Sequence, residues 1–98
     1  MMLKWVGGIL FVATFSAGAM AFEVEETFNK TCAICHVPGV AMAPKVGDAA
    51  AWEPRLALGM DALVKSVVNG KGAMPPKGMC SNCDEAQFAE LIKHMLPK

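Results

Sequence analysis

The stretch Cys32-Ala33-Ile34-Cys35-His36 decides how the rest of the chain is interpreted. The C-x-x-C-H pattern is the attachment signature for c-type haem. Two thiols near one helical turn apart can each add to a vinyl group of the haem, and the imidazole that follows can bind the iron from the same side. The motif therefore predicts one covalently bound haem c per chain, with Cys32 and Cys35 as thioether residues and His36 as an axial iron ligand.

Two other interpretations of the cysteines remain open at this stage. A C-x-x-C pair is also the redox site of thiol–disulfide oxidoreductases, although this chain has no βαβ pattern to carry one. The first pair and a second pair, Cys80-Ser81-Asn82-Cys83, together contain the four thiols of a Cys₄ zinc site. The two pairs lie far apart in the sequence, however, and a zinc site leaves His36 without a role.

Length and charge exclude several classes of protein. The chain has 98 residues, which allows at most one domain. Nine Lys and Arg balance nine Asp and Glu, so the formal net charge is zero and the chain has no basic footprint for nucleic acid. We therefore expect no nucleic-acid partner. A core this small rarely supplies more than about 3–5 kcal/mol, so the fold needs a further stabilising element.

The N-terminal segment has the pattern of a secretory signal peptide. Lys4 precedes the apolar run Trp5–Phe15, and small residues follow up to Ala19-Met20-Ala21. We expect residues 1–21 to be removed, leaving a domain over residues 22–98 in the periplasm of a bacterium. The alternative is an uncleaved anchor, because the apolar run is close to the length that spans a bilayer. Only in that case would the protein contact the membrane.

Apolar residues at helical spacing predict an all-α domain with about four short helices and no strand. The first helix is expected over residues 23–35 and the last over residues 84–96. Of the two helices between them, one has Pro54 in its first turn. The other begins at an Asp61 cap and ends at Gly70.

Two long stretches between these helices read as loops. Residues 37–48 and 70–83 are rich in glycine, proline and small side chains. Long loops are uncommon in so small a domain, and a ligand packed between them would account for their length.

A haem used for electron transfer is typically closed on both faces, and His/Met ligation raises its potential. Met74 is the best candidate for the second axial ligand, because it lies in a glycine-rich loop and Pro75-Pro76 restrict the backbone after it. Met79 in the same loop is the main alternative. Helix packing explains Met60 and Met95, and Met42 follows His36 too closely to reach the other face. The five methionines considered as second axial ligand are Met42, Met60, Met74, Met79 and Met95.

The second cysteine pair is most simply a disulfide. The loop that a Cys80–Cys83 bond would close is very short, so its entropic contribution is only about 2 kcal/mol. That contribution is enough to hold the loop next to Met74 and to start the last helix. A redox-active dithiol is the alternative, although no environment that would lower a thiol pKa is evident.

Several stretches together resemble cytochrome c₅, a family of small class I monohaem cytochromes c. They are C-A-I-C-H, A-P-K-V-G-D, A-A-A-W-E-P-R, G-K-G-A-M-P-P-K-G and M-C-S-N-C, and they cover essentially all of residues 22–98. The resemblance implies a class I helical fold wrapped around one haem, with His36 as proximal ligand and Met74 as distal ligand. It implies the Cys80–Cys83 disulfide as well.

Further side chains are candidates for supporting the haem. An iron-bound histidine donates its other ring N–H to a carbonyl or similar group, and class I cytochromes resemble one another in using a proline carbonyl at the position of Pro44. Trp52 and Arg55 are candidates to bind the propionates through the indole N–H and the guanidinium, although core packing of Trp52 and solvation of Arg55 explain them nearly as well. His94 lies on the flank of the last helix, where packing is its expected role.

The sequence therefore predicts an electron-transfer protein rather than an enzyme. Its expected partners are redox proteins, an electron donor and an electron acceptor, that dock transiently at the haem edge of a monomer or weak dimer. Lys45, Lys71 and Lys77 lie in the loops near that edge and either steer an acidic partner or are simply solvated. The alternative function is a haem sensor or peroxidase-like protein with an open sixth iron position.

Overall fold

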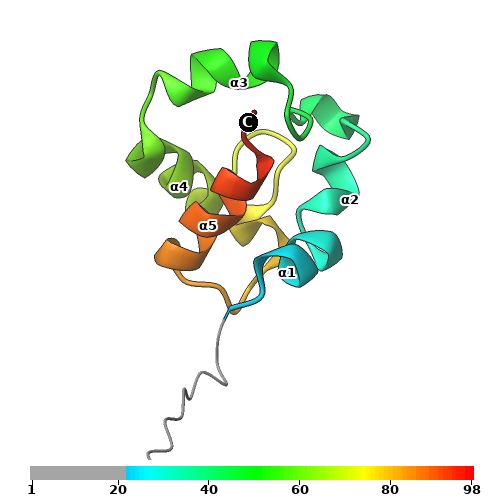
Figure 1. Cartoon of the computed structure of the whole chain (residues 1–98). Helices are drawn as coiled ribbons and strands as arrows, with labels where there is room; N and C mark the ends of the chain where they lie inside the picture. Colours follow the sequence, from blue (N-terminus) through cyan, green and yellow to red (C-terminus); the bar gives the residue numbers. More distant parts are fainter. Residues whose placement is uncertain (1–21) are drawn as a thin grey trace, which may run out of the picture.

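The computed structural model describes residues 22–98, and these residues form an all-α fold as predicted. The expected signal peptide, residues 1–21, lies outside the described residues. No helix in the described part is long and apolar enough to cross a membrane. Residues 22–98 contain five α-helices and two short 3₁₀-helices (Figure 1): α1 (Val24–Lys30), α2 (Ala33–His36), η2 (Val40–Met42), α3 (Ala49–Leu56), α4 (Met60–Asn69), η3 (Pro76–Met79) and α5 (Glu85–Met95).

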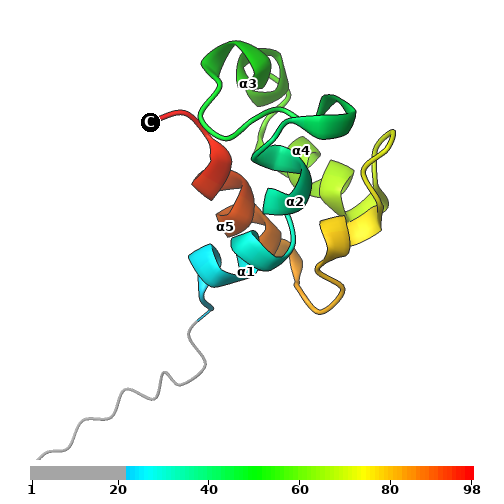
Figure 2. The same ribbon diagram turned by 90° about the vertical axis from the view of Figure 1, so that its right-hand side faces the viewer.

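The core is built where α5 packs against both α1 and α4 (Figures 1 and 2). The apolar stripe of α5 is almost completely buried, and Leu91 is only 1% exposed. Phe28 of α1 and Leu63 of α4 face this stripe within one hydrophobic cluster. Each such side chain contributes about 1.5–3 kcal/mol when it is fully buried. In both views α3 lies at the opposite end of the domain from α1.

The single helix predicted over residues 23–35 is wrong, because the structure has two helices there. α1 ends at Lys30, and Thr31 follows with φ −125° and ψ −78°, outside the helical region. The Thr31 hydroxyl donates a hydrogen bond of 2.7 Å to the Thr27 carbonyl in addition to the 3.1 Å bond from the Thr31 N–H, and this type of side-chain bond often bends a helix. As a result α2, with the C-x-x-C-H residues, is a separate short helix.

The two middle helices begin earlier than the sequence suggested. Asp48 caps α3 by accepting a hydrogen bond of 3.3 Å from the Ala51 N–H, so Pro54 lies in the second half of the helix and not in its first turn. The cap of α4 is Gly59, with φ 94°, and Asp61 is instead a first-turn residue. An acidic side chain is favourable both as the cap of a helix and in its first turn. The residue type alone therefore did not show which of the two positions Asp61 occupies.

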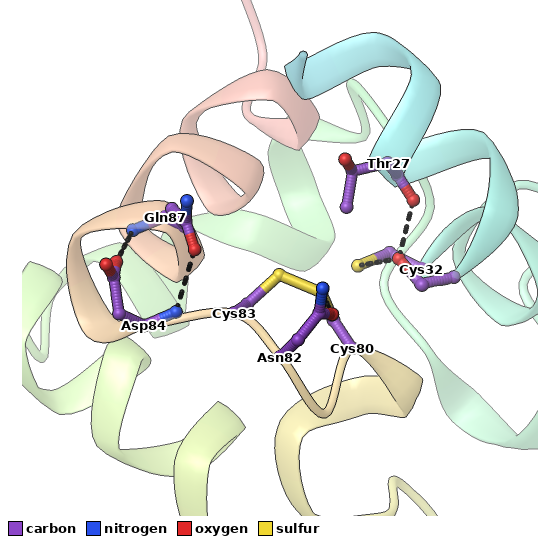
Figure 3. Close-up of a disulfide and its surroundings, with 8 residues drawn as sticks. Thr27, Cys32, Cys80, Asn82, Cys83, Asp84 and Gln87 are labelled. Carbon is purple, nitrogen blue, oxygen red and sulfur yellow. Dashed lines mark hydrogen bonds between the residues drawn. A yellow bond between two sulfur atoms is a disulfide. The ribbon is translucent and has the colours of Figure 1, made fainter. Parts of the chain in front are cut away.

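The last helix and the Cys80–Cys83 disulfide that precedes it are as predicted. Asp84 and Gln87 form a capping box in which each side chain accepts a hydrogen bond from the other residue's N–H, at 2.8 and 2.9 Å (Figure 3). A disulfide joins Cys80 to Cys83 directly before this cap, and both residues are buried in the hydrophobic core. The loop 70–83 is therefore fastened to the core at its end.

Candidate haem site

A cavity of about 540 Å³ lies between α2, α3, α4 and the loop that contains Met74. Its volume is in the range of roughly 300–1,000 Å³ that is usual for cofactor sites. In Figure 2 the loop of residues 70–80 (yellow) is drawn apart from α2, and residues of both segments line the cavity. Every residue predicted to hold or support the haem lines this one cavity: Cys32, Cys35, His36, Pro44, Trp52, Arg55 and Met74.

The two thiols of the motif are free and half-buried at the cavity wall. Cys32 caps the N-terminus of α2, and Cys35 lies within the helix. Burial raises the pKa of the Cys32 thiol, and a hydrogen bond of 3.4 Å from the Thr31 hydroxyl partly opposes that effect. Both sulfur atoms therefore lie at the wall of the cavity and are not bonded to each other.

The four cysteines do not form a zinc site. Cys80 and Cys83 are bonded to each other, which removes two of the four thiols that a Cys₄ site requires. In residues 22–98 no group of three or more His, Cys, Asp or Glu side chains is arranged to bind a metal ion. The disulfide lies in the core and does not line the cavity.

His36 is held in one orientation and one tautomer. Its imidazole is buried, and Nδ1 lies 2.8 Å from the Pro44 carbonyl oxygen. Because a carbonyl can only accept, Nδ1 must carry the proton, and Nε2 keeps its lone pair for a metal. The ring also stacks against Trp52, with ring centroids 6.2 Å apart.

The indole of Trp52 does not have the role that the sequence suggested. Its N–H donates a hydrogen bond of 2.8 Å to the Lys45 carbonyl, so its one donor is already engaged inside the protein. This N–H is therefore not free to donate a hydrogen bond to a haem propionate. Val46 N–H in turn donates to the His36 carbonyl at 3.1 Å. Three consecutive residues, Pro44, Lys45 and Val46, thus tie His36 and Trp52 to one segment.

Arg55 remains available at the edge of the cavity. One guanidinium N–H donates to the Ala51 carbonyl at 2.6 Å, and the side chain borders the main cavity and a smaller one of about 310 Å³ beside it. A guanidinium has further N–H donors, so one engaged donor leaves others for an anionic group. The smaller cavity is also lined by Lys45.

Met74 is held at the cavity wall by a tight turn. Its N–H donates to the Lys71 carbonyl at 2.9 Å, and its carbonyl accepts from the Lys71 N–H at 3.0 Å. A β-carbon on Gly70 would lie 3.0 Å from the Met74 carbonyl oxygen, so this close turn depends on glycine. Pro75 then fixes the backbone on the other side. Met74 is half-buried with its side chain at the cavity.

The other methionines are placed differently. Met79 and Met42 also line the cavity but are 58% and 90% exposed. Met95 is 2% exposed and belongs to the hydrophobic core, and Met60 packs against that core. The His94 ring packs against Phe28 in a tilted arrangement, with ring centroids 4.9 Å apart, in the contact between α1 and α5.

Sequence reasoning missed the apolar wall of the cavity. Leu63, Val67 and Ile92 line it from α4 and α5. Their helical spacing was visible, but the pattern shows only that a side chain faces inward. Whether the inward face meets another helix or a cofactor depends on tertiary packing.

The comparisons with known proteins agree on one class. A family model described as "Cytochrome C oxidase, cbb3-type, subunit III" matches residues 19–95. Cytochrome c5 of Ectopseudomonas mendocina is 40% identical over 82 residues, which cover 82% of this chain and 94% of that protein. The solved monohaem ferrocytochrome c of Shewanella putrefaciens is 49% identical with a TM-score of 0.70, covering 79% of this chain and 95% of that one.

A further similar chain comes from the crystal structure of an electron transfer complex of nitrite reductase with cytochrome c. It is 48% identical with a TM-score of 0.67, and the match covers 72% of this chain and 86% of that one.

The helical fold around a single cavity is that of the class I monohaem cytochromes c. With 39% and 40% identity to two cytochrome c5 proteins over most of its length, the chain belongs to the cytochrome c5 family. It carries one covalently bound haem c and functions as an electron carrier. These relatives do not favour the alternative of a sensor or peroxidase-like protein.

We expect Trp52→Phe to lower the free energy of unfolding by at least about 1 kcal/mol, because one buried hydrogen bond is lost and the phenyl ring fills less of the core than the indole. Denaturant unfolding of the holoprotein measures the change. Phe28→Leu, which disturbs the core without touching the segment of residues 44–46, is the control for general packing. An unchanged stability in Trp52→Phe would show that the bond to Lys45 contributes nothing.

Proposed function

We propose that the chain is an exported periplasmic carrier of single electrons and not an enzyme. In this proposal Cys32 and Cys35 form the thioether bonds to the haem, and His36 and Met74 are its axial ligands. The observation that carries the proposal is that both thiols, the oriented imidazole and the braced thioether line the same cavity. When bound, a haem supplies an iron centre that gains and loses one electron.

The donor set of the cavity suits such a group. An imidazole and a thioether are the axial pair typical of cytochromes c. The hydrogen bond to Pro44 orients His36 and increases its basicity toward iron. The apolar side chains of the wall exclude water, and a low dielectric around the iron raises the reduction potential. Two protein ligands leave no open position for a substrate, which is why we propose a carrier and not a catalyst.

We propose that redox partners dock at the mouth of the cavity, in short-lived contacts between monomers or weak dimers. The similar chain solved in complex with nitrite reductase supports a redox enzyme as one kind of partner. Among residues 22–98, Arg55 and Lys71 line the cavity and no Asp or Glu does. Lys45 and Lys77 are exposed in the neighbouring loops. This distribution suits an acidic partner surface and offers nothing to nucleic acid.

Replacing Met74 tests the ligand assignment. The ferric holoprotein should show a weak long-wavelength charge-transfer band between sulfur and iron, and Met74→Ala should lose it. The reduction potential should fall in the same variant, because the soft thioether ligand that favours the reduced iron has been removed. Absorption spectroscopy and potentiometry measure both effects.

Met79→Ala is the matched control, since Met79 lies in the same loop and at the same cavity. It should keep the band and the potential. Loss of the band in Met79→Ala instead would assign the ligand to that residue. A parent spectrum that is high-spin and shifts with carbon monoxide or cyanide would mean an open iron and would overturn the proposed function.

Charge reversal at the cavity tests the docking surface. We expect Lys71→Glu to slow electron transfer to an acidic redox protein severalfold at low ionic strength and to flatten the dependence of the rate on salt. Lys93→Glu is the control, because Lys93 is exposed on α5, pairs with Glu90 and does not line the cavity. Equal effects of the two variants, or a rate of the parent that does not depend on salt, would contradict steering.

Export is tested by the mass of the purified holoprotein. Cleavage after Ala21 leaves Phe22 as the first residue, and we expect the protein in the periplasmic fraction with this N-terminus. Retention of the first 21 residues, together with recovery in the membrane fraction, would show that the segment is an anchor.

A further inference from the structure

The turn that follows Met74 has an unusual backbone. Lys77, Gly78 and Met79 all have positive φ, at 64°, 53° and 71°. Only glycine adopts this region without cost, yet two of the three are not glycine. The turn is held by hydrogen bonds from Gly78 N–H to the Pro75 carbonyl at 3.0 Å and from Cys80 N–H to the Lys77 carbonyl at 2.8 Å. Gly78 is buried at its centre.

The turn brings the α-carbon of Gly78 against the end of the Met74 side chain. A β-carbon on Gly78 would lie 3.0 Å from the ε-carbon of Met74 and 4.0 Å from a γ-carbon of Val67. Ordinary contacts between carbon atoms are about 3.5–4.0 Å. The methyl group of Met74 therefore occupies space that any side chain at position 78 would take.

We propose that Gly78 is a positioning residue, whose missing side chain sets the direction from which the Met74 sulfur faces the cavity. The inference rests on the proposed function, in which that sulfur binds iron. A free methionine would swing its methyl away from a new β-carbon, because its side chain has three rotatable bonds. A sulfur committed to a metal can do so only by changing or weakening that bond.

The surroundings prevent the turn from moving away instead. Behind Gly78 lies Val67 of α4, and α4 and η3 pack against each other. Cys80 directly follows the turn, is 4% exposed and is bonded to Cys83 in the core. On the other side of Met74, Gly70 allows the close turn that fixes its backbone. The steric strain of a side chain added at position 78 must therefore be relieved by displacement of the Met74 thioether.

Imidazole binding to the ferric holoprotein measures this strain, because imidazole must displace Met74. Its apparent affinity is reduced by the small fraction of molecules in which the sulfur has left the iron. Overpacking that weakens the sulfur–iron bond raises this fraction. For Gly78→Ala we expect an apparent imidazole affinity about tenfold higher than in the parent, and a weaker charge-transfer band.

Gly47→Ala is the matched control. Gly47 also has a positive φ, 77°, but a β-carbon there meets nothing within 4 Å and the residue does not line the cavity. It should share the loss of stability that alanine causes in this backbone region while keeping the parent's imidazole affinity and band. Gly78→Asn is a second variant, since asparagine tolerates positive φ better than alanine but carries the same β-carbon. It should match Gly78→Ala in imidazole affinity.

The outcomes separate this inference from the ligand assignment. If Gly78→Ala and Gly78→Asn both keep the parent's imidazole affinity and band while Met74→Ala loses the band, Met74 is the ligand and Gly78 does not position it. If Met74→Ala keeps the band, the proposed ligand itself is wrong. A rise in imidazole affinity in Gly47→Ala equal to that in Gly78→Ala would overturn the inference as well, because the cause would then be general loss of stability.

Discussion

The hydrogen bond from His36 Nδ1 to the Pro44 carbonyl is the contact on which the proximal side of the site depends. It decides the tautomer of the imidazole and leaves Nε2 toward the cavity. It also requires the chain to return to α2 after the loop that follows His36. The same return brings the Lys45 carbonyl to the Trp52 indole, and Trp52 lies in α3. One short segment thus sets the ring orientation and the position of the next helix.

The opposite wall is organised by shape rather than by hydrogen bonds to the side chain. A thioether sulfur is only a weak acceptor, so a protein cannot orient it as it orients an imidazole. The structure instead fixes the backbone of Met74 through two hydrogen bonds to Lys71 and leaves space for its methyl beside Gly78. The disulfide between Cys80 and Cys83 then fastens this loop to the core. These contacts give the long loop that contains Met74 a fixed conformation as a wall of the cavity, although it forms no helix of normal length.

Sequence reasoning succeeded where the signal is local. The start of the last helix near Asp84 and the end of α4 at Gly70 each depend on a few neighbouring residues, and both lie where expected. It failed where a competing contact decides. The first helix ends at Thr31, whose hydroxyl and N–H both donate to the Thr27 carbonyl, and apolar spacing carries no signal of this end.

The start of α3 and the role of Trp52 could not be read from the sequence for a related reason. Asp48 was one of several residues able to cap a helix, and an indole N–H accepts any nearby carbonyl or carboxylate as partner. Only the fold of residues 44–46 places the Lys45 carbonyl within 2.8 Å of it. The choice between a backbone partner and a haem propionate is therefore a tertiary property.

The cavity and the core share side chains, which couples the redox site to the stability of the fold. Leu63, Ile92 and Met95 are buried in the hydrophobic cluster and also line the cavity. A group bound in the cavity therefore packs directly on α4 and α5 and adds its apolar surface to a core that is small for an independent domain. Because protein interiors are close-packed, a change of side-chain volume at Ile92 alters the packing of both the cavity and the core. The helices that hold the domain together thus also form the surface on which the haem packs.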